Sequence, residues 1–357
     1  MKHAFSRAVA LFLVAALFTL STPSCRGLSA DSYILLDGNT GVQLAGKNVH
    51  KRSLIASTTK IMTAIVVLET LDVNSTIVIP PEAVGVEGSS LYLQEGEELC
   101  VLDLLYGLML HSGNDAAVAL AIGSCGSVSR FVLRMNEKAK SLSLKDTHFE
   151  NPHGLDHKQH YSSAYDLGIL SAYALKNPIF RQIVSRKEIT AGSRKLRNHN
   201  RLLWMKDGVI GVKTGFTKAA GRILVSALSH EGRTLIAVTI HDGNDWQDHL
   251  SLYDYGISLY SRRLLFQKDT LIGQLPLFNG QVGLLYTTED FSAVVREEER
   301  PVFIIRYPLV PLGQNGLSYL DVYVGDLLVG RVCAKWKVDQ NGKNSKKNSL
   351  PGSVLSP

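Results

Sequence analysis

Three short polar clusters contain the residues of this chain that are best suited to chemistry. They read Ser57-Thr58-Thr59-Lys60, Ser112-Gly113-Asn114 and Lys213-Thr214-Gly215, and each pattern (Ser-x-x-Lys, Ser-x-Asn, Lys-Thr-Gly) occurs once in the 357 residues. Together they supply a nucleophilic hydroxyl, two amines, a second hydroxyl and an amide. These groups can attack a carbonyl through serine and hold an anionic substrate beside it, so the set predicts acyl transfer.

The spacing of Ser57 and Lys60 suits a nucleophile and its base. Three residues apart on a helix, the two side chains share a face, and a serine in the first turn has an unpaired N–H for a developing oxyanion. A free lysine is protonated at neutral pH, so its pKa must fall by about 3, equivalent to roughly 4 kcal/mol. Burial and a second cation both lower the pKa of a lysine, and Lys213 is the candidate for that cation.

The first thirty residues predict an export signal. Two basic residues precede an apolar run at 8–20, which is short for a membrane span, and Leu28-Ser29-Ala30 is the expected cleavage site. Cys25 lacks the leucine that lipoprotein signals carry three positions earlier, so acylation is not favoured; an uncleaved, anchoring signal is an alternative. A mature exported chain from Asp31 carries a formal charge of +3 instead of +6, too small an excess to indicate nucleic-acid binding.

The cysteines do not indicate a metal or redox site. Without Cys25, the chain retains Cys100, Cys125 and Cys333, and no Cys-x-x-Cys pattern is present. A Cys100–Cys125 disulfide and buried free thiols both stay open, because spacing alone does not establish pairing. No cofactor and no metal are expected.

Strand patterns at both ends of a helical middle predict a single sheet. Apolar segments at 33–37 and 42–46 favour a hairpin, and 208–215, 222–227 and 234–240 favour later strands. Helical periodicity covers 57–68, 102–110, 116–122, 128–142 and 245–261. We therefore expect an α/β domain over residues 31–264, an antiparallel sheet beside a helical lobe.

The rest of the chain has a different pattern. Strand-like segments at 281–286, 302–307, 321–324 and 327–330 alternate with turns and predict a small all-β domain over residues 265–338. Residues 339–357 are rich in Lys, Asn, Ser, Gly and Pro and predict a disordered polar tail.

Taken together, the three clusters resemble the active-site serine family of penicillin-binding proteins and serine β-lactamases. The chain is still more similar to the low-molecular-weight D-alanyl-D-alanine carboxypeptidases, because segments 57–64, 111–117, 151–156 and 211–217 are all typical of them. The resemblance covers residues 31–262. It implies a β-lactamase/DD-peptidase-like domain, and the predicted β domain fits the C-terminal domain of this family.

The resemblance implies a serine D-Ala-D-Ala carboxypeptidase that removes the terminal D-alanine from peptidoglycan stem pentapeptides. Ser57 would attack the penultimate D-Ala carbonyl, Lys60 would take its proton, and Ser112 would pass a proton to the leaving amine. β-Lactams would acylate the same serine and inhibit the enzyme. The implied substrate-binding residues are Asn114, Lys213, Thr214, Gly215 and Phe216, and the N–H groups of Ser57 and Phe216 would form the oxyanion hole.

Two features depart from that family. Many relatives end in an amphipathic helix that lies on the membrane, whereas residues 335–347 here are polar and Lys-rich, so C-terminal anchoring is not expected. Phe216 stands where some relatives carry His, which bears on substrate preference or pH dependence. Membrane association and oligomeric state stay open.

The sequence disfavours three alternatives to this prediction. A class A β-lactamase would have Ser-Asp-Asn as its second motif, and a Glu-x-x-Leu-Asn loop before Lys213, and this chain has neither. A zinc peptidase could use His153, His157 and His160, but Gly154 interrupts that segment and no Glu lies between the histidines. A non-catalytic wall-binding protein is disfavoured because both serines and both lysines of the clusters are intact.

Overall fold

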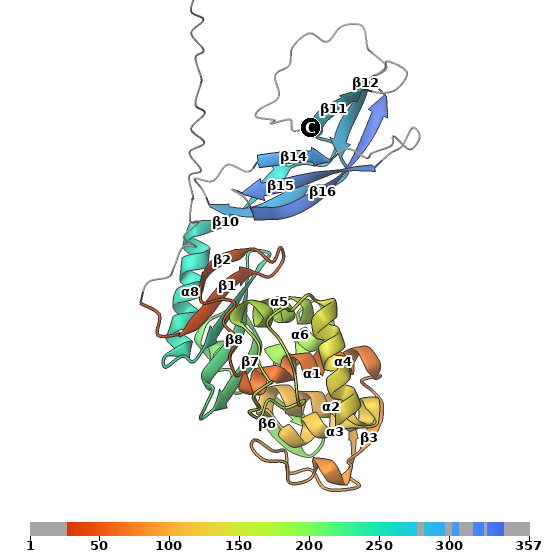
Figure 1. Cartoon of the computed structure of the whole chain (residues 1–357), viewed down its shortest axis with the longest axis vertical. Coiled ribbons are helices and arrows are strands. Elements are labelled where there is room, and N and C mark those ends of the chain that lie inside the picture. The colour runs from red at the N-terminus through yellow and green to blue at the C-terminus, as the bar shows by residue number, and fades with distance from the viewer. Residues whose placement is uncertain (1–26, 277–281, 297–301, 307–316, 325–326, 339–357) are drawn as a thin grey trace, which may run out of the picture.

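The chain folds into a domain of sheet and helices followed by a β domain (Figure 1). The computed structural model describes residues 27–276, 282–296, 302–306, 317–324 and 327–338. The predicted α/β class with a C-terminal all-β domain is confirmed. Most of the expected export signal and the whole of the polar tail at 339–357 lie outside the described residues.

Five antiparallel strands form the main sheet, in the order β2-β1-β9-β8-β7. They are β1 (Ser32–Asp37), β2 (Gln43–Lys47), β7 (Val209–Thr217), β8 (Gly221–His230) and β9 (Arg233–Ile240). Because β1 pairs with β9, the two ends of the domain meet in one sheet, as the strand patterns predict. The strand that carries Lys-Thr-Gly, β7, lies at the free edge.

Both faces of the sheet are covered by helices. Ile34 and Leu36 lie against Gly168 of α5 (Ala164–Ala174), whereas Leu35, between them, lies against Gly256 of α8 (Asp245–Leu259). Alternate residues of a strand point to opposite faces, so α5 and α8 pack on opposite sides of the sheet. This explains why β1 is apolar at consecutive positions rather than at alternate ones.

The helical lobe lies beside β7 and is built around α1. Every residue of α1 from Lys60 to Val67 is buried, whereas α4 buries only one face through Phe131, Met135 and Ala139. The helix expected from Ser57 begins as a 3₁₀ turn, and the α-helix proper starts at Lys60. The elements of the lobe are η1 (Ala56–Thr59), α1 (Lys60–Thr70), η2 (Pro81–Ala83), α2 (Val101–Tyr106), η3 (Gly107–His111), α3 (Asn114–Cys125), α4 (Val128–Ser141) and α6 (Pro178–Ser185).

Several short elements were not expected from the sequence. They are the hairpin strands β3 (Thr76–Val78) with β4 (Glu98–Cys100) and β5 (Glu188–Ala191) with β6 (Arg194–Arg197), and the one-turn helix α7 (Leu202–Met205). Strands of three or four residues are too short for an alternating pattern to stand out.

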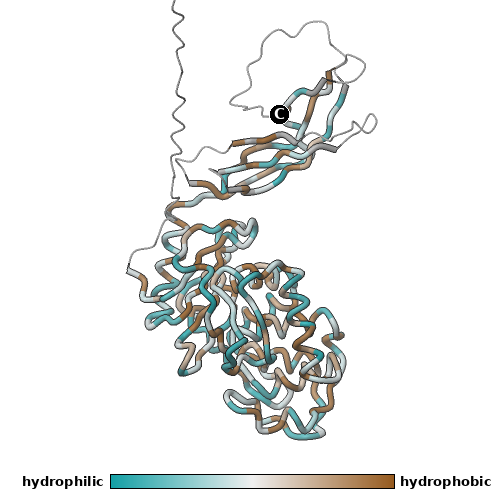
Figure 2. The backbone as a smooth tube through the Cα atoms, in the orientation of Figure 1, coloured by the Kyte–Doolittle hydropathy of each residue, from teal (hydrophilic) through white to brown (hydrophobic). Residues whose placement is uncertain are grey.

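The β domain begins where α8 runs directly into β10 (Tyr260–Phe266), so the expected boundary between residues 264 and 265 falls within that strand. This strand pairs with β13 (Phe291–Arg296), and a second sheet has the order β11-β12-β16-β15-β14. Its strands are β11 (Leu271–Pro276), β12 (Val282–Thr287), β14 (Val302–Arg306), β15 (Leu317–Val324) and β16 (Leu327–Val338). Along β12, fully buried residues alternate with more exposed ones, which is typical of a sheet with one buried face. Figure 2 shows hydrophobic and hydrophilic segments side by side in the described strands of this domain.

The three cysteines are unpaired. Cys100, Cys125 and Cys333 are free thiols, so the Cys100–Cys125 disulfide does not form in this structure.

In the described part of the chain, no single helix is both long and apolar enough to cross a bilayer.

The last residues assigned to the export signal belong to the folded domain. Ala30 is fully buried, and its carbonyl accepts a hydrogen bond from Lys47 Nζ at 3.0 Å. Ser29 N–H donates to Asp248 Oδ2 at 2.6 Å, and the Ser29 hydroxyl donates to Asp242 Oδ1 at 2.5 Å. These contacts connect the N-terminal segment to the start of α8.

We therefore predict that a chain beginning at Gly27 is more stable than one beginning at Asp31. Loss of these hydrogen bonds should lower the free energy of unfolding by about 2 kcal/mol, which lowers the melting temperature by roughly 4–8 °C. Thermal unfolding of the two purified chains, followed by circular dichroism, measures the difference. Equal melting temperatures would show that Ser29 and Ala30 add nothing to the fold.

Candidate active site

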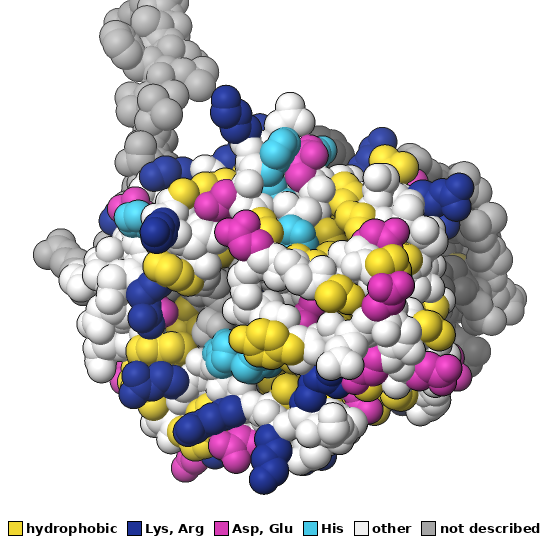
Figure 3. Space-filling model, turned by 90° about the horizontal axis from the view of Figure 1, so that it is seen from below, with side chains coloured by type: hydrophobic (Ala, Val, Ile, Leu, Met, Phe, Trp, Pro, Cys, Tyr) yellow, Lys and Arg dark blue, Asp and Glu magenta, His cyan; other side chains and the backbone are white. Residues whose placement is uncertain are grey.

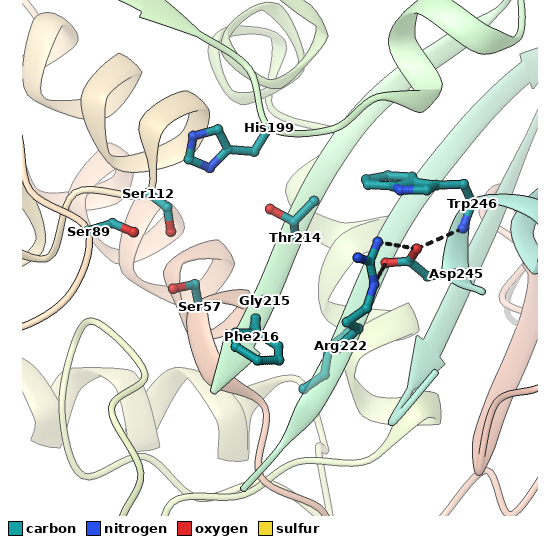
Figure 4. Close-up of a pocket in the computed structure, with 11 residues that line it drawn as sticks. Ser57, Ser89, Ser112, His199, Thr214, Gly215, Phe216, Arg222, Asp245 and Trp246 are labelled. Atoms are coloured by element: carbon teal, nitrogen blue, oxygen red, sulfur yellow. Dashed lines mark hydrogen bonds and ion pairs between the residues drawn. The ribbon is translucent and has the colours of Figure 1, made fainter. Parts of the chain in front are cut away.

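The structure brings the three polar clusters together at one cavity of about 460 Å³ between the helical lobe and β7 (Figure 4). Ser57, Ser112 and Thr214 line it, and the hydroxyls of the two serines point into the same space. Gly215 and Phe216 complete the wall on the β7 side. Behind this lining lie the buried side chains of Lys60, Asn114 and Lys213. All eight residues singled out from the sequence therefore belong to one site.

Ser57 lies in η1, directly before α1, where the backbone N–H groups of the first turn have no partner within the helix. The preceding residue, Ala56, has φ of +44°, an uncommon conformation for a residue with a side chain. A Cβ atom added to Gly215 would lie 3.3 Å from Ser57 N. The glycine of Lys-Thr-Gly thus allows the edge of the sheet to approach the backbone of the serine closely.

Lys60 has three polar neighbours at hydrogen-bond distance. Its Nζ donates to Asn114 Oδ1 at 2.6 Å and to His153 O at 2.7 Å, and it lies 2.9 Å from Ser57 Oγ. The first two are oxygens that only accept, whereas a hydroxyl can also donate. In an uncharged amine, the two hydrogens therefore go to the carbonyl oxygens and the lone pair faces Ser57 Oγ. This is the arrangement in which Lys60 can accept the proton of the serine.

Electrostatics favour the uncharged form of Lys60. Burial and then the positive charge of Lys213 lower the pKa of Lys60 well below its usual value, and Asp115 opposes this with a smaller effect. Burial lowers the pKa of Lys213 itself to about 7. Both conditions expected from the sequence, an enclosed lysine and a second cation nearby, are met.

The Ser-x-Asn segment is held by the start of α3. Ser112 has φ of +67°, which ends η3 and turns the chain into α3. Asn114 Nδ2 donates to Glu87 O, which leaves its Oδ1 facing Lys60. The Asp115 carboxylate accepts from the N–H groups of Leu91 and Leu93 at 2.7 and 3.3 Å. The motif therefore fixes both the amide that holds Lys60 and the loop that borders the cavity.

The loop at residues 151–155 is attached to α1 and orients Lys60. Thr63 Oγ1 donates to Pro152 O at 2.6 Å, next to the bond from Lys60 to His153 O. Gly154 has φ of +93°, and a Cβ atom there would lie 1.9 Å from Ala56 O. Only glycine therefore allows this loop to pack beside the residue that precedes the nucleophile.

The free edge of β7 presents backbone groups to the cavity. Asp242 N–H donates to Arg222 O at 3.0 Å, so the backbone groups of Arg222 face β9. Phe216, on β7, is the register partner of Arg222, on β8. Because the backbone groups of Arg222 face β9, this antiparallel pair exchanges no hydrogen bonds, and the backbone groups of both residues point away from the partner strand. The N–H and C=O of Phe216 are thus directed to the open edge, while its ring is exposed.

The three histidines considered as zinc ligands make other contacts in the structure. His153 Nδ1 accepts from Leu155 N–H, and His157 Nδ1 accepts from Gln159 N–H, each at 3.2 Å. His160 Nδ1 accepts from Glu150 N–H at 3.1 Å, and its Nε2 lies 2.7 Å from Thr59 Oγ1. Burial lowers the pKa of His160 to about 3, so this histidine is neutral. Both of its ring nitrogens are engaged in the two contacts above. Among the described residues, no group of three or more His, Cys, Asp or Glu is arranged to hold a metal ion.

Six further cavity residues were missed by the sequence analysis: Ser89, His199, Arg222, Ile223, Asp245 and Trp246. Arg222 donates to both carboxylate oxygens of Asp245, at 2.5 and 3.1 Å, and its guanidinium lies 5.6 Å from the Trp246 ring centre. These residues come from β8, the start of α8 and two loops, and no short motif joins them. Only the fold brings them to the site.

Comparison with known families agrees with this geometry. The family model of peptidase S11, D-alanyl-D-alanine carboxypeptidase, matches residues 18–244. The D-alanyl-D-alanine carboxypeptidase DacF of Bacillus subtilis is 33% identical over 285 residues, which are 76% of this chain and 73% of that protein. The D-alanyl-D-alanine carboxypeptidase DacD of Salmonella typhimurium is 38% identical over 332 residues, which are 84% of this chain and 84% of that protein.

Solved structures show the same similarity. Penicillin binding protein 5 from Haemophilus influenzae superposes with a TM-score of 0.76 at 27% identity, covering 88% of this chain and 98% of that one. Penicillin binding protein 6B from Escherichia coli gives a TM-score of 0.70 at 30% identity, covering 87% and 96%. The similarity therefore includes the β domain.

We predict that Gly154→Ala destabilises the fold and that Gly126→Ala does so far less. Both glycines have a left-handed φ, but at Gly126 the nearest atom to an added Cβ is 3.9 Å away. Gly126→Ala should cost about 1 kcal/mol of backbone strain, whereas the contact with Ala56 O should make the loss for Gly154→Ala at least about 3 kcal/mol. Chemical denaturation of both variants measures the difference. Equal losses would mean that the loop can move away from Ala56 at little cost.

Proposed function

This chain belongs to the peptidase S11 family of D-alanyl-D-alanine carboxypeptidases, and from that premise we propose roles for its residues in the reaction. It is a serine D-Ala-D-Ala carboxypeptidase that acts on peptidoglycan and binds penicillin. The predictions of family, enzyme class and fold are confirmed. The role of each residue is the proposal.

We propose that Ser57 Oγ attacks the carbonyl of the penultimate D-alanine while Lys60 takes its proton. The observation that carries this is the lysine geometry: two accept-only oxygens hold the Nζ hydrogens, and the third neighbour is the serine hydroxyl at 2.9 Å. A positioned base of lowered pKa is what a weak nucleophile such as serine needs.

The developing oxyanion is assigned to two backbone N–H groups. Ser57 N–H, in the first turn of η1, has no hydrogen-bond partner among the described residues, and Phe216 N–H points to the free edge of β7. The Gly215 contact with Ser57 N supports this pairing, since it keeps the two segments close. Two such donors stabilise a tetrahedral intermediate more than they stabilise the ground-state carbonyl.

The terminal carboxylate of the substrate is assigned to Lys213 and Thr214. Thr214 lines the cavity, and Lys213 is the buried cation beside it, with Nζ 2.9 Å from Thr214 O. Ser112 lies across the cavity, where its hydroxyl can pass a proton to the leaving amine. Water then hydrolyses the acyl-enzyme, and a β-lactam that acylates Ser57 acts as an inhibitor.

The substrate determines where the enzyme works. Peptidoglycan lies outside the cytoplasmic membrane, so the site of action is extracytoplasmic. We propose that the basic and apolar pattern of residues 1–30 directs that export.

We predict that wild-type protein converts a pentapeptide ending in D-Ala-D-Ala to the tetrapeptide with release of one alanine. Ser57→Ala should lose this activity by at least about 10³-fold and should lose covalent labelling by fluorescent penicillin. Mass spectrometry of the peptide and gel fluorescence measure the two effects. Ser89→Ala, another cavity serine, is the matched control and should still be labelled. Labelling that survives Ser57→Ala would place the nucleophile elsewhere.

We also predict a pH profile that reports both lysines. The rate of penicillin acylation should rise with pH as Lys60 loses its proton, because only the uncharged amine can accept the proton of Ser57. Removing the positive charge in Lys213→Gln should raise the pKa of Lys60, so the rise in residual acylation rate should move to higher pH.

Lys218→Gln, an exposed lysine just beyond the same strand, makes the same charge change and should leave the profile in place. Stopped-flow or gel-based acylation rates across the pH range provide the measurement. An unchanged midpoint in Lys213→Gln would show that Lys213 does not set the protonation of Lys60.

A further inference from the structure

One arginine, Arg222 of β8, is the only Lys or Arg among the described residues that line the active-site cavity. Lys60 and Lys213 lie behind this lining, with side chains that are almost fully buried. His199 also lines the cavity, but burial lowers its pKa to about 4, so it is neutral near pH 7. A carboxylate that enters the cavity therefore meets the permanent positive charge of Arg222 at the wall.

The guanidinium of Arg222 is held along one edge only. Its Nε and Nη2 donate to the two carboxylate oxygens of Asp245, at 3.1 and 2.5 Å. The Asp245 side chain is 4% exposed, whereas that of Arg222 is 44% exposed. A guanidinium has five N–H groups. The three that remain, two of them on Nη1, have no hydrogen-bond partner among the described residues. The free edge can therefore bind a second carboxylate through two parallel hydrogen bonds.

The first turn of α8 fixes where that free edge points. Asp245 Oδ1 also accepts from Trp246 N–H at 2.9 Å. The Arg222 guanidinium lies 5.6 Å from the Trp246 ring centre, so the ring restricts one face of the guanidinium. Because a helix N-terminus stabilises a carboxylate, part of the Asp245 charge is compensated by α8. Arg222 thus keeps part of its attraction for a ligand anion.

A row of buried polar contacts holds α8 on β8 beyond this pair. Asp245, His249 and Tyr253 are spaced by four residues, so they share one face of α8. Arg222 and Ser226 are four residues apart on β8 and share one face of the strand. Ser226 Oγ lies 2.6 Å from His249 Nδ1 and 2.5 Å from Tyr253 OH, and all three side chains are fully buried. These contacts fix the register that places Asp245 beside Arg222.

Arg222 reaches toward the place proposed for the terminal carboxylate. Figure 4 shows its side chain extending from beside Phe216 toward Thr214, and all three residues line the cavity. Lys213, by contrast, donates to Thr214 O at 2.9 Å and is only 1% exposed. Its position suits an effect on the protonation of Lys60, whereas Arg222 can contact a ligand directly.

The outer surface carries charges of both signs. The whole chain has a net charge of only +6. At the end of the molecule formed by the helical lobe, Figure 3 shows Lys and Arg side chains as well as Asp and Glu side chains. A surface of mixed sign attracts anions less than a surface of one sign does. Recognition of a carboxylate therefore depends on a cation within the cavity.

We propose that Arg222 binds the terminal carboxylate of the substrate through the guanidinium edge that Asp245 leaves free, and so makes the enzyme selective for substrates with a carboxylate after the scissile bond. The inference rests on the proposed function, because it adds a binding residue to the same acyl transfer. Thr214 donates its hydroxyl to the same carboxylate. Asp245 is a positioning residue, since it contacts Arg222 and not the substrate. The carboxylate of a penicillin presents the same group.

The test compares two thioesters that share one acyl part, an N-acylated D-alanine. The thiol leaving group ends in a carboxylate in the first thioester and in the corresponding amide in the second. The reactive thioester bond keeps both rates measurable. For Arg222→Gln, we expect the ratio of kcat/KM for the acid to kcat/KM for the amide to fall at least about tenfold, because a charge-assisted hydrogen-bonded pair is lost. Labelling at saturating fluorescent penicillin checks that the variant is folded.

Arg134→Gln is the matched control. Arg134 is an exposed arginine of α4 that also pairs with a carboxylate, that of Glu137, and it lies outside the cavity. This variant should keep the ratio of the wild-type enzyme. A ratio that falls in Lys213→Gln but not in Arg222→Gln would assign the charge to Lys213 and overturn the inference.

A second test uses the wild-type enzyme alone. The ratio should stay constant from about pH 6 to about pH 9, because an arginine keeps its charge over this range. Burial lowers the pKa of Lys213 to about 7, so a carboxylate bound mainly by Lys213 would make the ratio fall as the pH rises through that value. The protonation of Lys60 affects both thioesters alike and cancels in the ratio. A fall of the ratio near pH 7 would therefore count against Arg222.

The inference and the proposed function fail in different ways. If the wild-type enzyme cleaves the pentapeptide and takes the penicillin label, but Arg222→Gln keeps the wild-type ratio, the inference is overturned and the proposed function stands. If the wild-type enzyme neither cleaves the pentapeptide nor takes the label, the proposed function itself fails.

Discussion

A buried lysine that must stay uncharged is the constraint on which the rest of this site depends. Lys60 lies at the start of a helix buried along most of its length, and no carboxylate forms an ion pair with it in the described structure. Its partners are two carbonyl oxygens and one hydroxyl. Carbonyl oxygens accept hydrogen bonds from N–H groups without supplying a full negative charge. They therefore orient the amine without favouring its protonated form. A carboxylate in either position would raise the pKa of the lysine and remove the base.

The surrounding structure provides those two oxygens from separate parts of the chain. Asn114 is oriented by its bond to Glu87 O, and His153 O is held by a loop that packs on Ala56 through Gly154. The second cation comes from the sheet, where Lys213 is buried on the edge strand. Burial thus has two effects: it lowers the pKa of both lysines, and it keeps their mutual repulsion unscreened by water. Loops that look irregular along the sequence are here the parts that control protonation.

The edge strand connects this proton chemistry to substrate binding. The Phe216 N–H points outward from β7, and Gly215 allows that edge to approach Ser57. An extended peptide added along this edge would place its carbonyl between the serine and the backbone donors. It would also run from Phe216 past Thr214 toward His199 (Figure 4). In the proposed mechanism, one strand therefore sets both the position of the carbonyl and the direction of the bound peptide.

The sequence by itself determined the candidate reactive residues, the strands of the main sheet and the family, because these depend on local patterns; the helices α5 and α6 were not expected from it. Three motifs, each found once, identify the candidate serine, the lysines and the edge strand. The continuous apolar runs of β1, β8 and β9 and the helical apolar period of α4 are strong enough to predict those elements. Phe216 and Lys213 could be expected at the site because they belong to the same motif segment.

Only the tertiary structure decided which groups surround the candidate reactive residues. His153 contributes a backbone oxygen, which no residue type encodes. Arg222, Trp246 and His199 reach the cavity from segments that have no shared motif. The hairpin β5–β6 and the helix α7 contain four residues in each element, which is too few for a periodic pattern to predict them. The protonation of Lys60 belongs to this second group as well, since a pKa depends on burial and on charges brought close by the fold.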